Sequence, residues 1–416
     1  MSTSRRRTAS VIVLTATLAS TSAVELARAA PAPAALIAAK SIAGPTRSPA
    51  SAVNGQTRWT SEPMPVADAS LFNATQIDQH TTWAYGVQVA AQGLAPLLLA
   101  KDDRDARGWT AVPTVPVTGS NRINSVSAVS ARDAWLVGDF DPAIGGIVTG
   151  HWDGTEWRTV AVPLPDKAYS GGLLSVSAHA SDDVWAAGWA EILDSREPDP
   201  DKPGGWIDVT HSESLLEHWN GKTWQREPAP DPTVALSTVT AVSRNDVWAA
   251  GNTNDDQPAL LHFDGRTWST VPAPRYAGRY GEFNSLATNG PNDVWAIGRV
   301  LLDDNDRGHA LVAHWDGHRW QQITTPADAG RLWNAATVPG GIAVVGSTPS
   351  QADGYGMRLT DNRWNSLGIP VGNTTHTFSY GVLYSAGKLA VIGSTRSDQS
   401  PEPQPLVLTG TGLGHS

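Results

Sequence analysis

Small and apolar residues alternate in short stretches that recur along the chain, and residues 125–129 (Ser-Val-Ser-Ala-Val) are typical of them. This alternation predicts a strand, because successive side chains of a strand point to opposite faces. In four units the stretch precedes the pattern Asp-x-Trp-x-x-Gly, and in the first and the last two units this pattern is degenerate. In the four units the pattern is followed by His-Trp-Asp-Gly or a close variant and, after two further residues, by another Trp. Asp-Gly and Asn-Gly pairs favour tight hairpin turns. We therefore predict repeated units of short strands joined by tight turns.

The glycine that ends Asp-x-Trp-x-x-Gly marks the length of the repeat. Successive glycines are 47 to 63 residues apart, which is the size of a four-stranded propeller blade with variable loops. The seven glycines are Gly86, Gly138, Gly188, Gly251, Gly298, Gly346 and Gly393. We expect the Trp of the pattern to fill the wedge between adjacent sheets. We expect its Asp to cap a turn by accepting backbone N–H groups.

The last unit ends without the closing Trp and the Pro-x-Pro that follow it in other units. Both occur instead near the N-terminus, in residues 58–65 (Arg-Trp-Thr-Ser-Glu-Pro-Met-Pro). We infer that this N-terminal strand completes the last blade, so that the two ends of the domain close the ring. The predicted fold is an all-β, seven-bladed β-propeller over residues 55–411, followed by a tail at residues 412–416.

Residues 1–29 have the three parts of an export signal. Arg5-Arg6-Arg7 is a basic start, residues 11–24 are mostly apolar, and Ala27-Arg28-Ala29 is a small-x-small cleavage site. Both the Sec and the twin-arginine routes remain open. Residues 30–54 are rich in Ala, Pro and Ser and are predicted to be a flexible linker. We expect a secreted, extracellular protein.

Composition narrows the possible chemistry. The 416 residues include 18 Trp, 39 Gly and 29 Pro, which suits an all-β chain with many turns. The absence of Cys excludes disulfides, thiolate metal sites and a Cys nucleophile. Removal of the signal would change the formal charge from −10 to −13, which argues against nucleic acid as a partner. We also expect no cofactor, no membrane span and a monomer.

The repeat resembles a known group. An apolar strand ending in Gly, then Trp-Asp-Gly, Trp and Pro-x-Pro, is similar to the kelch-type repeat and to repeats of secreted actinobacterial propellers. It departs from kelch in having one glycine where that family usually has a pair. The resemblance implies a propeller of the galactose-oxidase type, without that enzyme's cofactor, because the Tyr–Cys cross-link needs a cysteine. It implies architecture and leaves function open.

Histidines recur at equivalent positions of four units, at His151, His218, His262 and His314. Because they lie in different units, we expect them to be spread around the ring and to bind no common metal ion. The acidic run at residues 303–306 could hold calcium, but its spacing departs from the usual calcium loop. Solvated acidic turns are the preferred interpretation, and no metal site is predicted.

Residues that are peculiar to one unit are the candidates for ligand binding. We expect the loops between blades, and those between the second and third strands, to emerge on one face of the ring, near the channel. The candidates are Arg122, Asn124, Tyr169, Tyr276, Arg279, Tyr280, Glu282, Arg331, Trp333, His376, Phe378 and Tyr380, together with Trp206, Asp208 and His211 of an insertion at residues 189–212. Aromatic rings interleaved with Arg, Glu and Asn suit a sugar or peptide pocket. The insertion could cover the channel mouth as a lid.

Three functions remain open. The preferred one is a binding module for a glycan, a cell-wall polymer or a protein partner at this face. The first alternative is a glycan-active enzyme with carboxylates at the channel mouth, for which Glu282 is the leading acid. The second is a structural scaffold for protein interactions. The sequence contains no nucleophile elbow, zinc-protease motif or phosphate loop.

Overall fold

The computed structural model describes residues 57–91, 93–115, 122–199, 202, 204–231, 234–302, 308–350, 353–370, 375–397 and 400–411. The predicted signal, the linker up to residue 54, the tail and the acidic run 303–306 lie outside the described residues. Within the described ranges all regular structure is β, in 28 strands that form six antiparallel sheets. The prediction of an all-β propeller is confirmed.

Five sheets have four strands each, and we number the four-stranded blades in chain order. Blade 1 consists of β2 (Ala69–Gln76), β3 (Thr81–Ala90), β4 (Gly93–Asp102) and β5 (Thr110–Ala111). Blade 4 consists of β14 (Ala235–Ser243), β15 (Asp246–Asn252), β16 (Pro258–Phe263) and β17 (Trp268–Val271). Blade 5 consists of β18 (Tyr280–Gly290), β19 (Asp293–Leu301), β20 (His309–Trp315) and β21 (Trp320–Gln322). Blade 6 consists of β22 (Leu332–Val338), β23 (Gly341–Ser347), β24 (Gly354–Thr360) and β25 (Arg363–Ser366).

The remaining four-stranded sheet, blade 7, joins the two ends of the domain. It consists of β26 (Thr375–Ser385), β27 (Lys388–Ser397), β28 (Ser400–Thr411) and the N-terminal strand β1 (Arg58–Ser61). Strand β1 pairs antiparallel with β28, with Arg58 opposite Thr411 and Ser61 opposite Leu408. The inference that the N-terminal strand completes the last blade is therefore correct.

The sixth sheet has eight strands and contains blades 2 and 3. Blade 2 consists of β6 (Ile123–Ser130), β7 (Asp133–Asp141), β8 (Gly146–Trp152) and β9 (Trp157–Thr159). Blade 3 consists of β10 (Ala168–Ala180), β11 (Asp183–Pro198), β12 (Trp206–Trp219) and β13 (Trp224–Arg226). They are joined by one residue pair, Gly172 with Asp139. Counting this sheet as two blades is our interpretation, so the number of blades remains the prediction made from the sequence.

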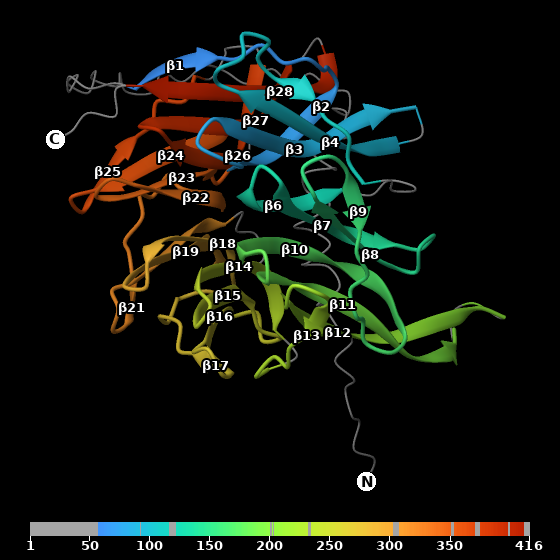
Figure 1. Cartoon of the computed structure of the whole chain (residues 1–416). Coiled ribbons are helices and arrows are strands. Elements are labelled where there is room, and N and C mark those ends of the chain that lie inside the picture. Colours follow the sequence, from blue (N-terminus) through green and yellow to red (C-terminus); the bar gives the residue numbers. More distant parts are fainter. Residues whose placement is uncertain are drawn as a thin grey trace, which may run out of the picture.

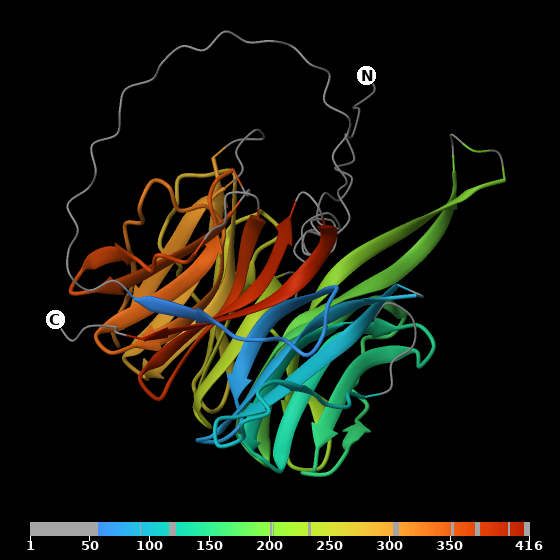
Figure 2. The same cartoon turned by 90° about the horizontal axis from the view of Figure 1, so that it is seen from above.

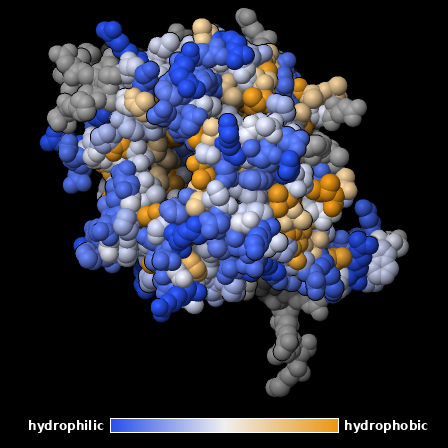
Figure 3. Space-filling view, viewed as in Figure 1, coloured by the Kyte–Doolittle hydropathy of each residue, from blue (hydrophilic) through white to orange (hydrophobic). Residues whose placement is uncertain are grey.

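The first strands of neighbouring blades contact one another in a closed cycle, from β2 through β6, β10, β14, β18, β22 and β26 back to β2. Figure 1 shows β6, β14, β18 and β22 near the middle of the molecule, and β17, β21 and β25 towards its edge. The space-filling view from the same direction is hollowed near its middle (Figure 3). The sheets are thus arranged around a central axis. No helix of the described part is long and apolar enough to cross a membrane.

The Trp of Asp-x-Trp fills the wedge between adjacent blades, as predicted. Trp248 of blade 4 is 2% exposed. Its ring centroid lies 5.2 Å from the centroids of both Trp315 and Trp320 of blade 5. The neighbouring Asp, which the sequence predicts to cap a turn, instead contacts a histidine: Asp246 Oδ1 lies 2.8 Å from Nε2 of His262. This His also lies against Trp248, with ring centroids 4.2 Å apart.

The same contacts recur in three other blades. The ring centroids of Trp and His are 4.5, 4.2 and 4.0 Å apart in blades 2, 3 and 5, and Asp–His distances there are 2.8 to 2.9 Å. Each histidine therefore contacts an Asp and a Trp of its own blade. Among the residues that the structure describes, no group of three or more His, Asp or Glu side chains is placed to hold a metal ion.

Candidate ligand-binding site

A β-bulge interrupts the first strand of every blade at the same place. In blade 4, Leu236 pairs with Gly251 and Thr238 with Ala250, so that Ser237 is the extra residue. The bulge is repeated at equivalent positions of the other first strands. The extra residues are Phe72, Asn124, Leu174, Ser237, Asn284, Trp333 and Tyr380, which we call the bulge ring.

The bulge explains why the repeat needs a glycine on the second strand. A Cβ at Gly251 would lie 1.8 Å from the carbonyl oxygen of Ala235, and a Cβ at Gly298 would lie 1.9 Å from that of Glu282. These distances are far inside van der Waals contact, so only glycine allows the two strands to approach here. A bulge with this close approach re-aims the side chain of the first strand. The glycine of each repeat and its bulge-ring residue therefore belong to the same local structure.

All seven bulge-ring residues line a cavity of about 420 Å³ on the central axis. Its other lining residues are mostly Ser, Thr and Asn of the first strands, with Arg122 and Arg331 at one end of β6 and β22. No Asp, Glu, His or Lys lies among the described residues of this lining. The cavity therefore offers hydroxyl, amide and guanidinium groups to a ligand, together with aromatic rings.

The aromatic members of the bulge ring come from three consecutive blades. Tyr380 of blade 7 meets the edge of Phe72 of blade 1, with ring centroids 6.1 Å apart, and that of Trp333 of blade 6 at 6.3 Å. Tyr380 is also parallel to Phe378, at 6.3 Å and 9°. Burial raises the pKa of Tyr380 to about 12, so the hydroxyl stays protonated. One arc of the cavity is thus aromatic, and the opposite arc carries Asn124, Leu174, Ser237 and Asn284.

A buried ion pair holds Trp333 in place. The guanidinium carbon of Arg331 lies 3.8 Å from the centroid of the Trp333 ring, and Arg331 Nη2 lies 2.8 Å from Glu282 Oε1. Glu282 also pairs with Arg299 at 2.9 Å and accepts the hydroxyl hydrogen of Tyr280. Burial lowers the pKa of Arg331 to about 10, so the guanidinium remains charged at neutral pH.

Glu282 is locked inside this network. It is 3% exposed. Burial opposes its ionisation, but Arg331, Arg299 and Tyr280 outweigh burial and lower its pKa. A carboxylate with a lowered pKa is a poor proton donor at neutral pH. Glu282 therefore serves to position Arg331 and Trp333, and it does not line the cavity as the predicted leading acid would.

A second ion pair lies in blade 2, on the other side of the cavity. Arg122 Nε lies 3.0 Å from Asp139 Oδ2, and Asn124 donates to Asp139 Oδ1 at 2.8 Å. Asn124 also donates to the carbonyl oxygen of Leu173 in the next blade at 3.0 Å. These contacts orient Arg122 and Asn124 at the cavity wall.

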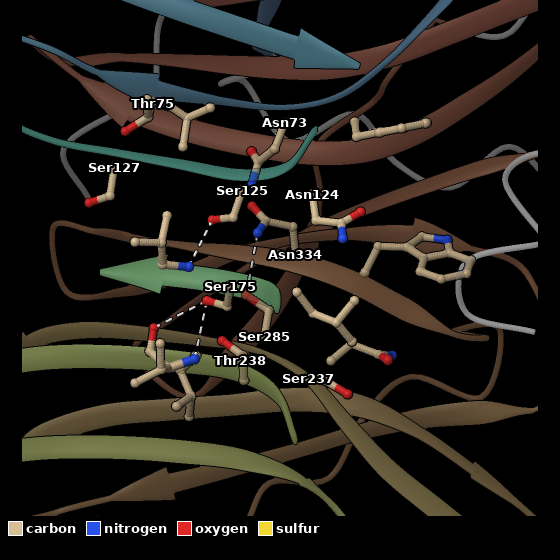
Figure 4. A pocket seen from close by; sticks show the side chains of 18 of the residues that line it. Asn73, Thr75, Asn124, Ser125, Ser127, Ser175, Ser237, Thr238, Ser285 and Asn334 are labelled. Atoms are coloured by element: carbon tan, nitrogen blue, oxygen red, sulfur yellow. Dashed lines mark hydrogen bonds between the residues drawn. The ribbon is translucent and has the colours of Figure 1, made fainter. Parts of the chain in front are cut away.

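Many hydroxyl groups of the first strands bridge neighbouring blades. Ser125 accepts the backbone N–H of Val176 at 3.2 Å, and Ser175 accepts that of Val239 at 3.1 Å (Figure 4). Asn334 accepts the backbone N–H of Val382 at 3.1 Å. These small polar residues therefore hold the ring together. This limits how many of them can also bind a ligand, and it leaves the bulge ring as the more variable part of the lining.

The predicted loop 276–282 lies beside the cavity rather than in it. Tyr276 packs on Phe283, with ring centroids 6.3 Å apart, and its hydroxyl is buried without a hydrogen-bond partner among the described residues. Tyr280 is 6% exposed and points to Glu282. Arg279 is exposed, with its backbone N–H bonded to Leu301. The expectation that these side chains reach the channel is not met, because β18 begins at Tyr280 and extends the sheet past the bulge.

The insertion in blade 3 is not a lid. Residues 189–198 and 206–212 continue β11 and β12 as paired strands, with Pro198 opposite Trp206 and one register shift between Leu193 and Ser195. Both views show the hairpin running outward beyond the body instead of across its middle (Figures 1 and 2). Trp206 is 66% exposed. Asp208 pairs with Arg196 at 2.8 Å, and His211 with Asp194 at 2.9 Å.

Two further candidates also lie outside the cavity lining. Tyr169 at the start of β10 is 43% exposed. Burial and the charge of Glu191 raise its pKa. His376 is exposed, and its Nδ1 lies 3.3 Å from Asp353 Oδ1. Of the predicted residues, the structure therefore gathers Arg122, Asn124, Arg331, Trp333 and Tyr380 around one cavity.

Four members of the bulge ring are not among the predicted residues: Phe72, Leu174, Ser237 and Asn284. A signal for them exists, because every bulge-ring residue lies 13 or 14 positions before the glycine of its repeat. Residue types vary at this position while the surrounding pattern repeats. Such variation at a fixed place in a repeat is what a ligand-contacting position would show.

Comparisons with known proteins agree with the fold. No family model and no curated protein matches the chain. Among solved structures, the chain is similar to YCF48 from Cyanidioschyzon merolae, with a TM-score of 0.53 and 12% identity over 85% of this chain and 98% of that one. It is also similar to Trypanosoma rangeli sialidase in complex with sialic acid (TM-score 0.43, 11% identity, 86% of this chain, 57% of the sialidase). A further match is SapL1 lectin in complex with alpha methyl fucoside (0.42, 12%, 72% and 94%). At these identities the likeness shows the fold alone, and the kelch-type resemblance stays a prediction.

Proposed function

We propose that the protein is an exported propeller that binds a glycan, such as a chain of a cell-wall polymer, in the cavity on its central axis. The observation that carries the proposal is the bulge ring, which places an aromatic arc opposite an arc rich in amide and hydroxyl groups. Aromatic rings pack against the apolar faces of sugars, and amides and guanidinium groups bond to sugar oxygens. The sequence of residues 1–29 supports export.

Binding is preferred to cleavage because of the charges around the cavity. Glycoside hydrolysis needs two carboxyl groups on either side of the bond that breaks. No carboxylate lines the cavity among the described residues. Glu282 and Asp139 are engaged with arginines next to it. The glycan-active enzyme remains the alternative that this arrangement favours less.

A protein-interaction scaffold is the second candidate, and the projecting hairpin favours it. Trp206 and Ile207 at its tip are 66% and 46% exposed. Exposed apolar side chains on a projecting element are typical of protein interaction sites. In this case the partner would bind the hairpin and would leave the cavity unused.

The test is retention of the purified protein on insoluble polysaccharides and on purified cell walls, with the variant Trp333→Ala. Because Trp333 is half-buried and lies outside the hydrophobic clusters between blades, the variant is expected to fold. Loss of a stacking ring removes about 1–2 kcal/mol of binding, so retention should weaken about tenfold.

Arg279→Ala is the matched control, because Arg279 is exposed and does not line the cavity. It should bind like the unmodified protein. Equal retention of the protein and both variants would place the site elsewhere. Failure of the unmodified protein to bind any polymer would favour a protein partner, which Trp206→Ala would then test.

A further inference from the structure

A second cavity, of about 120 Å³, lies between blades 7 and 1, away from the central axis. The walls come from both blades and from the segment after β1. They include Glu62, Lys101, Trp109, Lys388 and Ala390. None of these residues lines the axial cavity. The seam cavity is therefore independent of the site proposed above.

The seam cavity lies where blade 7 lacks the Trp and His that fill the wedges of blades 2 to 5. Ala390 pairs with Thr409 in the register in which Trp248 pairs with His262. An Ala and a Thr thus replace the Trp and His of the repeat. The large ring that fills the wedge between blades 4 and 5 has no counterpart here, and empty volume remains.

One aromatic wall of the wedge is retained. Trp109 of blade 1 holds the place that Trp320 holds in blade 5, where the ring lies 5.2 Å from Trp248 and at 80° to it. The indole N–H of Trp109 donates to Glu62 Oε2 at 2.6 Å. An aromatic ring that enters the seam cavity can therefore meet Trp109 as Trp248 meets Trp320.

The charge at one end of the cavity is reversed relative to blades 2 to 5, which carry an Asp at this position. In blade 5, the indole N–H of Trp295 donates to Asp293 at 2.7 Å. In blade 7, Lys388 holds the position of this Asp, since Ser385 pairs with Lys388 as Ser243 pairs with Asp246 in blade 4. A hydrogen-bond donor with positive charge thus replaces an acceptor. A matching ligand must carry an acceptor, ideally an anion.

The other ionisable side chains of the seam cavity already have partners. Lys101 Nζ lies 2.6 Å from Glu62 Oε2, and His80 lies 2.9 Å from Asp103. Within the described part of the chain, Lys388 makes no ion pair and is exposed at the mouth. The volume of about 120 Å³ is close to the roughly 150 Å³ of a cavity that binds benzene, and the polar residues of the lining would face the polar end of a ligand.

We propose that the seam cavity binds a small aromatic carboxylate, whose ring takes the place of the missing indole beside Ala390 and whose carboxylate pairs with Lys388. The apolar contacts come from Trp109, Leu383 and Val407, which line the cavity. The charge contact selects an acid over an amine of the same shape. Such a ligand would join the two ends of the ring and stabilise its closure.

Benzoate is the probe, titrated into the full protein by calorimetry and by ligand-observed NMR, with benzylamine as the cationic counterpart. We expect saturable binding of benzoate and at least about tenfold weaker binding of benzylamine. Lys388→Glu should reverse this preference. Lys222→Glu, an exposed lysine in a turn of blade 3, is the matched control and should leave both affinities unchanged.

Ala390→Trp restores the repeat and should abolish benzoate binding by filling the cavity. If this variant does not fold, Lys388→Glu still tests the proposal, because its side chain is exposed. Absence of saturable benzoate binding, or equal binding of benzoate and benzylamine, would overturn the proposal. So would unchanged benzoate affinity in Lys388→Glu.

Discussion

The seam between blades 4 and 5 and the seam between blades 7 and 1 are built on the same backbone register but with opposite chemistry. The first contains Trp248 against Trp315 and Trp320, in a buried apolar cluster. The second has Ala390 and Thr409 in place of the Trp and His, and the Glu62–Lys101 ion pair forms part of the wall of the cavity that this leaves. The bulges and glycines determine the register of the strands, so this register does not depend on which side chains fill the wedge. The side chains of the wedge can therefore differ at the seam beside blade 7, where the two ends of the domain pair.

The largest expected effect is at the apolar seam. Trp248→Ala removes a side chain that is 2% exposed and should lower the free energy of unfolding by about 3–5 kcal/mol, through lost burial and the cavity left behind. Chemical denaturation followed by circular dichroism measures the loss. A loss below about 1 kcal/mol would mean that neighbouring rings collapse into the space and that the wedge contributes little.

A third seam contains a buried carboxyl group where blade 4 has an apolar side chain. Glu217 of blade 3 is 0% exposed and stands where blade 4 has Leu261. Its two carboxylate oxygens have no hydrogen-bond partner among the described residues. Burial raises its pKa to about 8 from the ordinary 4.5, with Arg226 opposing and Glu227 adding to the shift.

Because the unfolded chain ionises Glu217 above pH 4.5, its cost to stability grows as the pH rises and is complete above about pH 8. Glu217→Gln should therefore gain stability relative to the parent protein between pH 5 and pH 9, by on the order of a few kcal/mol. Thermal unfolding at a series of pH values measures the gain. A constant difference across this range would show that Glu217 is not buried as described.

Glu62 offers the contrasting case of a carboxylate that is well partnered. Burial opposes its ionisation, but hydrogen bonds from Lys101, Thr409 and Trp109 lower its pKa. It therefore stabilises the fold above pH 4.5 and loses this effect as the pH falls through its folded pKa. Glu62→Gln should cost about 1–3 kcal/mol at neutral pH, and the cost should shrink in acid. Equal costs at pH 7 and pH 3 would contradict this account.

The smallest effect is expected from restoring the repeat at the polar seam. Ala390→Trp adds apolar burial but crowds Lys101 and Thr409, so its net gain should be about 1 kcal/mol or less. The same denaturation experiment measures it. A loss above about 2 kcal/mol would mean that the polar network leaves no room for a wedge.

Most of the fold could be predicted from the sequence, because the repeat indicates where the strands and turns of each unit lie. The pattern around Trp248 predicts both the strands and the wedge, and the displaced residues 58–65 predict the closure of the last blade. The partnership of Asp246 with His262 was missed. Backbone capping is the local role of Asp in a turn, and a contact across two strands depends on their register, which the pattern leaves open.

The candidate site was only partly predictable. Arg331, Trp333 and Tyr380 stand out because they occur in one unit each. Ser237 and Asn284 do not, since such residues are common at turns and strand edges. Their place on the axis depends on a bulge, which follows from the close approach at Gly251 and its equivalents. Tyr280 was misplaced for a related reason: sequence shows no sign that β18 begins so early.

The pairing of β1 with β28 also determines how the ring responds to mechanical force. Arg58 lies opposite Thr411, so both chain ends leave this strand pair at the same side. Tension between the two ends would load the Arg58–Thr411 pair first and then each next pair in turn, like a zipper. The force needed for such peeling is only the force that separates one residue pair at a time. The rate of forced opening is set by the free-energy barrier to unfolding. Tension from one end to a ligand held on the axis would instead load β1 or β28 within the closed ring. A protein anchored by one end could thus bear load that the same protein, pulled from both ends, could not.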